Sequence, residues 1–321
     1  MSDLKDIGFY TLSDDRAKNS SMTSPLKRCE LVLTGRCTFN CPYCRQVGGA
    51  DIALAQAKAT VNLWCDEGLE NIRFTGGEPT LYKGLGELVS LAKNRGVKRI
   101  ALSTNGAVAL RKYLELIELG VNDFSISLDA CCAEDGDKMA GDRRGSFNKV
   151  VKNIRELSAI SYVTVGVVLT ADNKERAEDV IRFADTLGVQ DIRVIPAAQD
   201  GERLPVLELN ESLLRKYPIL RYRVNNIASN IPVRGLINGD SRRCGLVLDD
   251  MAVMGDKHYP CIIHLRESGS PIGTIGASMR KDRLEWFKTH DSHQDPICAR
   301  NCLDVCTNYN NKYAAFHEEE V

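Results

Sequence analysis

The sequence lacks long apolar runs and recognisable targeting segments. No apolar stretch approaches the roughly 20 residues that a membrane-spanning helix needs. The amino terminus, MSDLKDIGFYTLSDD, does not show the basic, apolar and small-residue succession of a secretory signal peptide. We therefore expect no membrane association and a cytoplasmic location.

Net charge is also nearly absent. The 42 Lys and Arg residues almost balance the 43 Asp and Glu residues, so the formal net charge is −1 at pH 7. No chain-wide electrostatic field would draw the protein to nucleic acid or anionic lipid. The 321 residues, 43% hydrophobic and 26% charged, are enough to bury a substantial core.

Cysteine, in contrast, is abundant, with twelve residues. Disulfides are unfavourable in a reducing cytosol, so thiols clustered at short spacing favour metal binding. Eight of the twelve cysteines fall into two such groups. The other four, Cys29, Cys65, Cys131 and Cys132, have no partner at short spacing and are interpreted as small buried hydrophobic residues.

Residues 29–197 alternate between short β-branched runs and longer segments of helical period, which is typical of βα units around a parallel sheet. Six strands are expected, at residues 30–33, 71–74, 99–103, 123–127, 163–169 and 191–195. Five helices are expected, at residues 53–67, 85–95, 111–119, 146–157 and 174–187. Gly96, Gly120 and Gly188 stand at expected helix ends. The pattern predicts an α/β fold with a partial, TIM-like (β/α)6 barrel.

The composition changes after Pro196, and Gly and Cys become frequent farther on. We expect an N-terminal extension (1–28), the barrel (29–205), a small cysteine-rich α+β domain (206–315) and an acidic tail (316–321).

The first cysteine group follows the first expected strand in the segment LTGRCTFNCPYC. Its members Cys37, Cys41 and Cys44 lie within eight residues. Three thiolates in such a loop can hold three corners of a cubane cluster and leave the fourth iron without a protein ligand, where a small molecule can coordinate. A zinc ion with a distant fourth ligand is the alternative.

Polar motifs follow the next three strands. The second strand leads into TGGEP, in which Gly76 and Gly77 allow close backbone approach to a ligand and Glu78 can accept a hydrogen bond from an ammonium group. The third and fourth strands end in STNG (103–106) and SLD (127–129), at strand ends where βα barrels collect polar ligand groups. Taken alone, GGEP could be a turn and STNG a helix cap.

Together these features resemble the radical S-adenosylmethionine (SAM) superfamily, with its Cys-x3-Cys-x-φ-Cys signature, in which φ is an aromatic residue, and its GGE motif. The resemblance implies that Cys37, Cys41 and Cys44 hold a [4Fe-4S] cluster whose open iron chelates SAM. Reductive cleavage of SAM would then give a 5′-deoxyadenosyl radical that abstracts a hydrogen atom. It also implies that SAM is bound by Tyr43, Gly76, Gly77, Glu78, Ser103, Asn105, Ser127 and Asp129.

The second cysteine group resembles the SPASM and shorter twitch extensions of that superfamily. Cys244 and Cys261 flank an expected β-hairpin that contains Gly255, and Cys298, Cys302 and Cys306 follow. The twitch form implies one auxiliary [4Fe-4S] cluster, held by Cys244, Cys261, Cys298 and either Cys302 or Cys306. A structural zinc ion is the alternative.

The resemblance implies hydrogen abstraction from a substrate and a reductant such as flavodoxin or ferredoxin. Oxidation of the substrate through the auxiliary cluster is the expected outcome, and epimerisation, dehydration or formation of a carbon–carbon or carbon–sulfur bond remain alternatives. Only 36 residues precede Cys37, too few for a leader-binding domain, which favours a small molecule over a peptide. A SPASM-type peptide maturase remains an alternative. So does a non-catalytic electron-transfer or redox-sensing protein, although such a protein would not need the GGEP and STNG motifs.

Other residues are candidates for substrate contacts. The stretches SLDA and RRGSF resemble the molybdenum-cofactor cyclase, whose expected Gly-Arg-Arg tail is absent. Within RRGSF, Arg143 and Arg144 are candidates for binding an anionic substrate. His258, Tyr259 and His264 flank Cys261 and are candidates for contact with the substrate or the cluster.

Overall fold

The computed structural model describes residues 14–45, 48–199 and 204–317. The six expected strands are present and pair in parallel in the order β6-β5-β4-β3-β2-β1. They are β1 (Arg28–Val32), β2 (Asn71–Thr75), β3 (Arg99–Thr104), β4 (Asp123–Ser127), β5 (Tyr162–Leu169) and β6 (Asp191–Pro196). The prediction of an α/β fold with a partial parallel barrel is confirmed.

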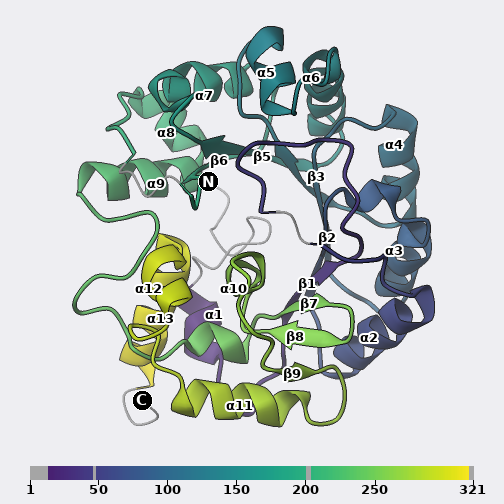
Figure 1. Ribbon diagram of the computed structural model, residues 1–321, viewed down its shortest axis with the longest axis vertical. Helices are drawn as coiled ribbons and strands as arrows, with labels where there is room; N and C mark the ends of the chain where they lie inside the picture. Colours follow the sequence, from purple (N-terminus) through teal and green to yellow (C-terminus); the bar gives the residue numbers. More distant parts are fainter. Residues whose placement is uncertain (1–13, 46–47, 200–203, 318–321) are drawn as a thin grey trace.

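Helices cover the outer face of this curved sheet (Figure 1). They are α2 (Leu54–Asp66), α3 (Leu85–Asn94), α4 (Leu110–Leu119), α5 (Ala133–Met139), α6 (Ser146–Ser158) and α7 (Ala177–Asp185), with the short 3-10 helices η2 (Pro79–Leu81) and η3 (Lys174–Arg176). Each long helix buries a stripe of apolar side chains; in α3 these are Leu85, Leu88, Val89 and Ala92. Gly96, Gly120 and Gly188 have positive φ where helices end, as predicted.

The sheet continues past β1 into the cysteine-rich part of the chain. Strand β7 (Ala252–Met254) pairs in parallel with β1, so that Glu30 lies opposite Ala252. Strands β8 (Lys257–Tyr259) and β9 (Gly273–Thr274) then add antiparallel pairs and complete a nine-stranded sheet. The predicted hairpin is β7–β8, and Gly255 has a φ of 62° at its turn. The two predicted domains therefore share one sheet.

The remaining elements pack at the open side of the barrel (Figure 1). They are α1 (Asp14–Asn19), α8 (Glu211–Lys216), α9 (Pro218–Ala228), η4 (Gly245–Leu248), α10 (Ile262–Arg266), α11 (Met279–Thr289), α12 (Pro296–Asn301) and α13 (Asp304–Phe316). Leu246, Val247, Phe287, Tyr309 and Tyr313 form a separate small core there.

The two ends of the described chain meet at this core. Ala17 of α1 is buried in it, and Arg16 forms an ion pair with the buried Asp249. Helix α13 extends through Phe316, the first residue of the predicted tail, and residues 318–321 lie outside the described residues. No helix in the described ranges combines the length and the apolar character that crossing a bilayer requires.

Candidate functional site

A cavity of about 360 Å³ opens at the carboxyl ends of the barrel strands. Helix α10 and the segments around residues 234 and 303 close its other side. The three cysteines of the first group line the cavity together with seven of the eight predicted SAM-binding residues: Tyr43, Gly76, Gly77, Ser103, Asn105, Ser127 and Asp129. Glu78 is not among the lining residues. The predicted residues thus converge on one space, as the carboxyl ends of parallel strands do.

The glycine pair holds the backbone that leads into the first cysteine group. The amide of Gly77 donates to the carbonyl of Thr34 at 2.8 Å, and the amide of Glu78 donates to that of Arg36 at 2.7 Å. A Cβ atom on Gly77 would overlap the Arg36 carbonyl oxygen, and one on Gly76 would overlap that of Thr34. The glycines therefore allow a close backbone approach, as expected, but the group that they approach is the backbone of residues 34–36, directly before Cys37.

The three thiols of the first group are not in disulfides. Cys37 and Cys44 are exposed and Cys41 is half-buried. Burial raises the pKa of the Cys41 thiol to about 12, so this thiol is neutral unless a cation replaces its proton. A bound metal ion deprotonates a coordinating thiol, and the donor set of three unpaired thiols facing one cavity fits a cluster with one open iron.

Glu78 is a buried connector between two strands. Its carboxylate accepts hydrogen bonds from the Thr80 hydroxyl at 2.6 Å, the Thr104 hydroxyl at 2.9 Å and the Asn105 amide at 2.8 Å. Burial raises the pKa of Glu78 and these hydrogen bonds oppose the rise. The carboxylate therefore positions Asn105, whose side-chain amide donates to Thr38 at 2.9 Å beside Cys37.

Tyr43 joins the cysteine loop to the end of β4. Its hydroxyl donates to the buried Asp129, whose other carboxylate oxygen accepts from the amide of Val168 at 2.7 Å. The Tyr43 carbonyl accepts from the side chain of Gln199 at 2.6 Å. Burial raises the pKa of Asp129 to about 6. The hydroxyl and the carbonyl of Tyr43 thus have partners within the chain, and its predicted contact with SAM stays a prediction.

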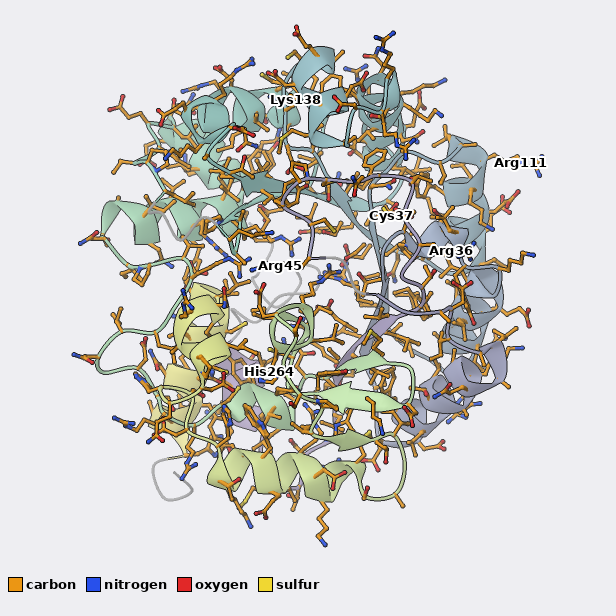
Figure 2. All side chains as sticks on the ribbon, in the orientation of Figure 1. Arg36, Cys37, Arg45, Arg111, Lys138 and His264 are labelled. Carbon is orange, nitrogen blue, oxygen red and sulfur yellow. The ribbon has the colours of Figure 1, made fainter. Side chains whose placement is uncertain are left out.

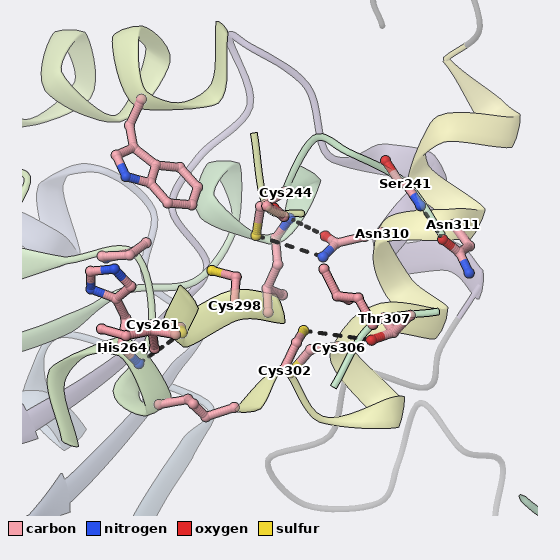
Figure 3. A pocket seen from close by; sticks show the side chains of 17 residues that line it. Ser241, Cys244, Cys261, His264, Cys298, Cys302, Cys306, Thr307, Asn310 and Asn311 are labelled. Carbon is pink, nitrogen blue, oxygen red and sulfur yellow. Dashed lines mark hydrogen bonds between the residues drawn. The ribbon is translucent and has the colours of Figure 1, made fainter. Parts of the chain in front are cut away.

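All five cysteines of the second group line one small apolar pocket, which is shown in Figure 3. Three of their sulfur atoms accept hydrogen bonds: Cys244 from Asn310 at 3.7 Å, Cys261 from the amide of His264 at 3.4 Å, and Cys302 from Thr307 at 3.5 Å. Burial raises the pKa of each of the five thiols, and that of Cys302 to about 12. Five half-buried thiols around one space fit a four-thiolate metal centre.

The edge of this pocket also offers mixed ligands. Ligand atoms of His290, Asp295 and Cys298 lie within 4.8 Å of one another. Asp295 additionally contacts His264, with 3.2 Å between its carboxylate and Nε2 of the ring. Such a set of nitrogen, oxygen and sulfur atoms also suits zinc, the alternative foreseen for this group.

Several predicted contacts take other positions. Arg143 and Arg144 are exposed and do not line the cavity. His258 is fully buried against Asp282 and Arg283, so its role there is packing of the hairpin. Cys29 is buried, whereas Cys65, Cys131 and Cys132 are half-buried, so the interpretation as small buried hydrophobic residues is confirmed for Cys29 alone. The Cys131 sulfur accepts a hydrogen bond from Arg176 at 2.9 Å.

Sequence reasoning missed all five arginines that line the cavity: Arg45, Arg73, Arg193, Arg234 and Arg266. Arg45 follows Cys44 directly, and Arg266 lies five residues after Cys261, at the end of α10. Their nearness to cysteines was the available signal. No local pattern marked Arg234.

Comparison with known proteins agrees with this geometry. The family model of the radical SAM superfamily matches residues 31–184. The GTP 3′,8-cyclase of Peptoclostridium acidaminophilum is 29% identical over 204 residues, which cover 59% of this chain and 62% of that protein. The mitochondrial GTP 3′,8-cyclase of Arabidopsis thaliana is 26% identical over 208 residues, covering 59% and 52%. The chain thus spans about half to two thirds of the length of these curated relatives.

A solved structure, native anSMEcpe with bound AdoMet and a peptide, resembles the fold with a TM-score of 0.59 at 15% identity. The likeness covers 91% of this chain and 98% of that chain, so it includes the cysteine-rich part. The family match and the likeness of fold lead to one conclusion: the chain carries a radical SAM domain, and its α/β fold is that of radical SAM enzymes.

Proposed function

We propose that this protein is a cytoplasmic radical SAM enzyme that cleaves SAM reductively, abstracts a hydrogen atom from a small molecule and oxidises it. The observation that carries the proposal is the convergence of Cys37, Cys41 and Cys44 with the ends of β2, β3 and β4 on one cavity. A [4Fe-4S] cluster and SAM bound there would supply one-electron cleavage to a 5′-deoxyadenosyl radical. The cavity volume is in the range of small-molecule sites.

The chain's own residues would hold and shield these reactants. The glycine pair seats the cysteine loop, Glu78 holds Asn105 beside Cys37, and the Tyr43–Asp129 contact ties the other end of the loop to β4. Phe39 and Ile262 add apolar walls to the cavity. Such fixed geometry lowers the entropic cost of aligning two reactants and excludes water from a reactive centre.

The second cysteine group would hold one auxiliary [4Fe-4S] cluster. We propose Cys244, Cys261, Cys298 and Cys302 as its ligands, because the Cys302 sulfur already accepts a hydrogen bond from Thr307 and Figure 3 shows it facing the same space as Cys244 and Cys298. Such a cluster would supply an acceptor for the second electron of an oxidation. Ile263 lines both this pocket and the cavity, so the two sites adjoin. Flavodoxin or ferredoxin is the proposed reductant.

The test is formation of 5′-deoxyadenosine by anaerobically reconstituted protein with SAM and dithionite, measured by mass spectrometry. Variants Cys37→Ser, Cys41→Ser and Cys44→Ser should lose the product, whereas Cys65→Ser should retain it. Iron should amount to about eight atoms per chain, four for each cluster. Cys302→Ser should lose about half of that iron, and Cys306→Ser should retain it. Zinc at the first group, or intact SAM with wild-type protein, would refute the proposal.

A second candidate reaction is a radical cyclisation of a nucleotide. It is favoured by the similarity to relatives named GTP 3′,8-cyclase, which covers 59% of this chain. Consumption of GTP that depends on SAM and on Cys37 would support it. If GTP is unchanged while 5′-deoxyadenosine accumulates, this second candidate falls and the general proposal stands.

A further inference from the structure

The charged residues around the cavity are mostly cationic. They are Glu30, Arg45, Arg73, Asp129, Arg193, Arg234, Arg266 and Glu267. Two of the three carboxylates belong to ion pairs, Glu30 with Arg73 at 3.8 Å and Glu267 with Arg45 at 3.0 Å. The third, Asp129, accepts the hydroxyl of Tyr43 and has a raised pKa. Among the residues that line the cavity, positive charge therefore exceeds negative charge.

Arg234 is held at this cavity without a carboxylate partner. Its Nε donates to the carbonyl of Pro196 at 2.9 Å and its Nη1 donates to that of Asn301 at 3.4 Å. None of the carboxylates in the described part of the chain lies within ion-pair distance of it. Burial lowers the pKa of Arg234; the charge of Glu267 opposes this effect, and the neighbouring Arg223 and Arg45 lower the pKa further. Keeping this side chain charged therefore costs folding free energy.

Arg266 approaches the first cysteine group from the opposite module. It stands at the end of α10, which begins directly after Cys261, and its Nη2 donates to the Thr75 hydroxyl at 3.3 Å. Its charge lowers the pKa of Cys44, although burial has the larger, opposite effect on that thiol. Among the described residues no carboxylate forms an ion pair with Arg266.

Arg45 completes the group. Its guanidinium binds both oxygens of Glu267, at 3.3 Å and 3.0 Å, and Glu267 follows Arg266 in the sequence. Figure 2 shows Arg45 near the middle of the molecule, between the barrel and the cysteine-rich helices. The three arginines thus come from the cysteine loop, the linking segment and α10, and they line the same cavity.

We infer that Arg45, Arg234 and Arg266 form an oxyanion-binding site that recognises a phosphate or carboxylate group of the substrate. The guanidinium fork matches both groups by paired hydrogen bonds, and a bound anion would offset the cost of the two cations that lack a carboxylate partner. The inference rests on the proposed function, since it names the substrate class of the same cavity. It places the anionic end of the substrate on the side of the cysteine-rich module.

The test is calorimetric titration of reconstituted, SAM-loaded protein with inorganic pyrophosphate and, separately, with malonate. At least one of these anions should bind saturably, and Arg234→Gln and Arg266→Gln should each weaken its binding at least tenfold. Arg111→Gln is the matched control, because Arg111 lies on the outer rim in Figure 2 and pairs with Glu115 of its own helix. This control should bind as the wild-type protein does.

Three outcomes would overturn the inference: no saturable binding of either anion, equal binding by all variants, or an Arg266→Gln effect on SAM affinity with anion binding unchanged. The last would assign Arg266 to SAM itself. Formation of 5′-deoxyadenosine in the same samples separates the two proposals. If SAM is cleaved and no anion binds, the inference of an anionic substrate is refuted, whereas the proposed radical SAM activity is not.

Discussion

Glu78 is a buried carboxylate that accepts hydrogen bonds from neutral donors. No cation among the described residues forms an ion pair with it. Its value lies in position: it joins the turn after β2 to the end of β3 and so places Asn105 beside Cys37. The sequence predicted that these residues share a site. It could not show that the hydrogen-bond donors to Glu78 are Thr80, Thr104 and Asn105 of the chain itself. A sequence motif does not reveal whether a carboxylate accepts hydrogen bonds from the protein or from a bound ligand.

The glycine pair allows a test at this scale. Gly77→Ala would push a methyl group into the Arg36 carbonyl, in the backbone that seats the first cysteine group. We expect the variant to lose most of the iron of that group, about four atoms, while its far-UV circular dichroism stays that of the wild type. Gly48→Ala is the control, because a Cβ there meets no atom. Full iron content in Gly77→Ala would contradict this role of the glycine.

Elements are where local sequence is most informative. All six barrel strands were predicted, since each is a short apolar run. The longer helices between them were predicted from their continuous stripes of apolar side chains. Helix α5 was missed because its sequence, AEDGDKM, has no apolar period. The β1–β7 pairing was also missed, because it joins residues more than 200 positions apart and nothing local indicates it. For the same reason the sequence could not predict that Arg234 lies at the cavity.

Helices α9 and α13 offer a stability test. Arg223 of α9 and Asp304 of α13 pair at 3.0 Å, and both side chains are 1% exposed. Asp304→Ala would leave the arginine buried without its partner, so we expect a loss of about 3–5 kcal/mol in the free energy of unfolding. Urea denaturation measures it. Removal of the exposed partner in Glu115→Ala should cost less than about 1 kcal/mol, and equal losses would contradict the argument.

The whole molecule should become less stable as pH rises through the weakly acidic range. Burial raises the pKa of Asp191 from 3.8 to about 7, so the folded state retains a proton that the unfolded state has lost. Stability from this group is full below about pH 4 and declines until about pH 7, by at most about 1.4 kcal/mol per pH unit. Asp191→Asn stays neutral.

We therefore expect Asp191→Asn to gain stability relative to the wild type between pH 5 and pH 8 in urea unfolding of the reconstituted protein. The comparison cancels the pH dependence of the metal centres, which both proteins share. A constant difference between the two proteins across that range would show that Asp191 does not titrate as its burial implies.

The continuous sheet has one more consequence. Because β7 occupies the free side of β1, a protein cut near residue 205 would leave a bare edge strand beside the cysteine loop. Exposed edges of this kind recruit other chains through their unsatisfied backbone amides and carbonyls. The cysteine-rich segment therefore also acts as a cover that protects the barrel from self-association, and the shortened barrel would aggregate even with every one of its own residues intact.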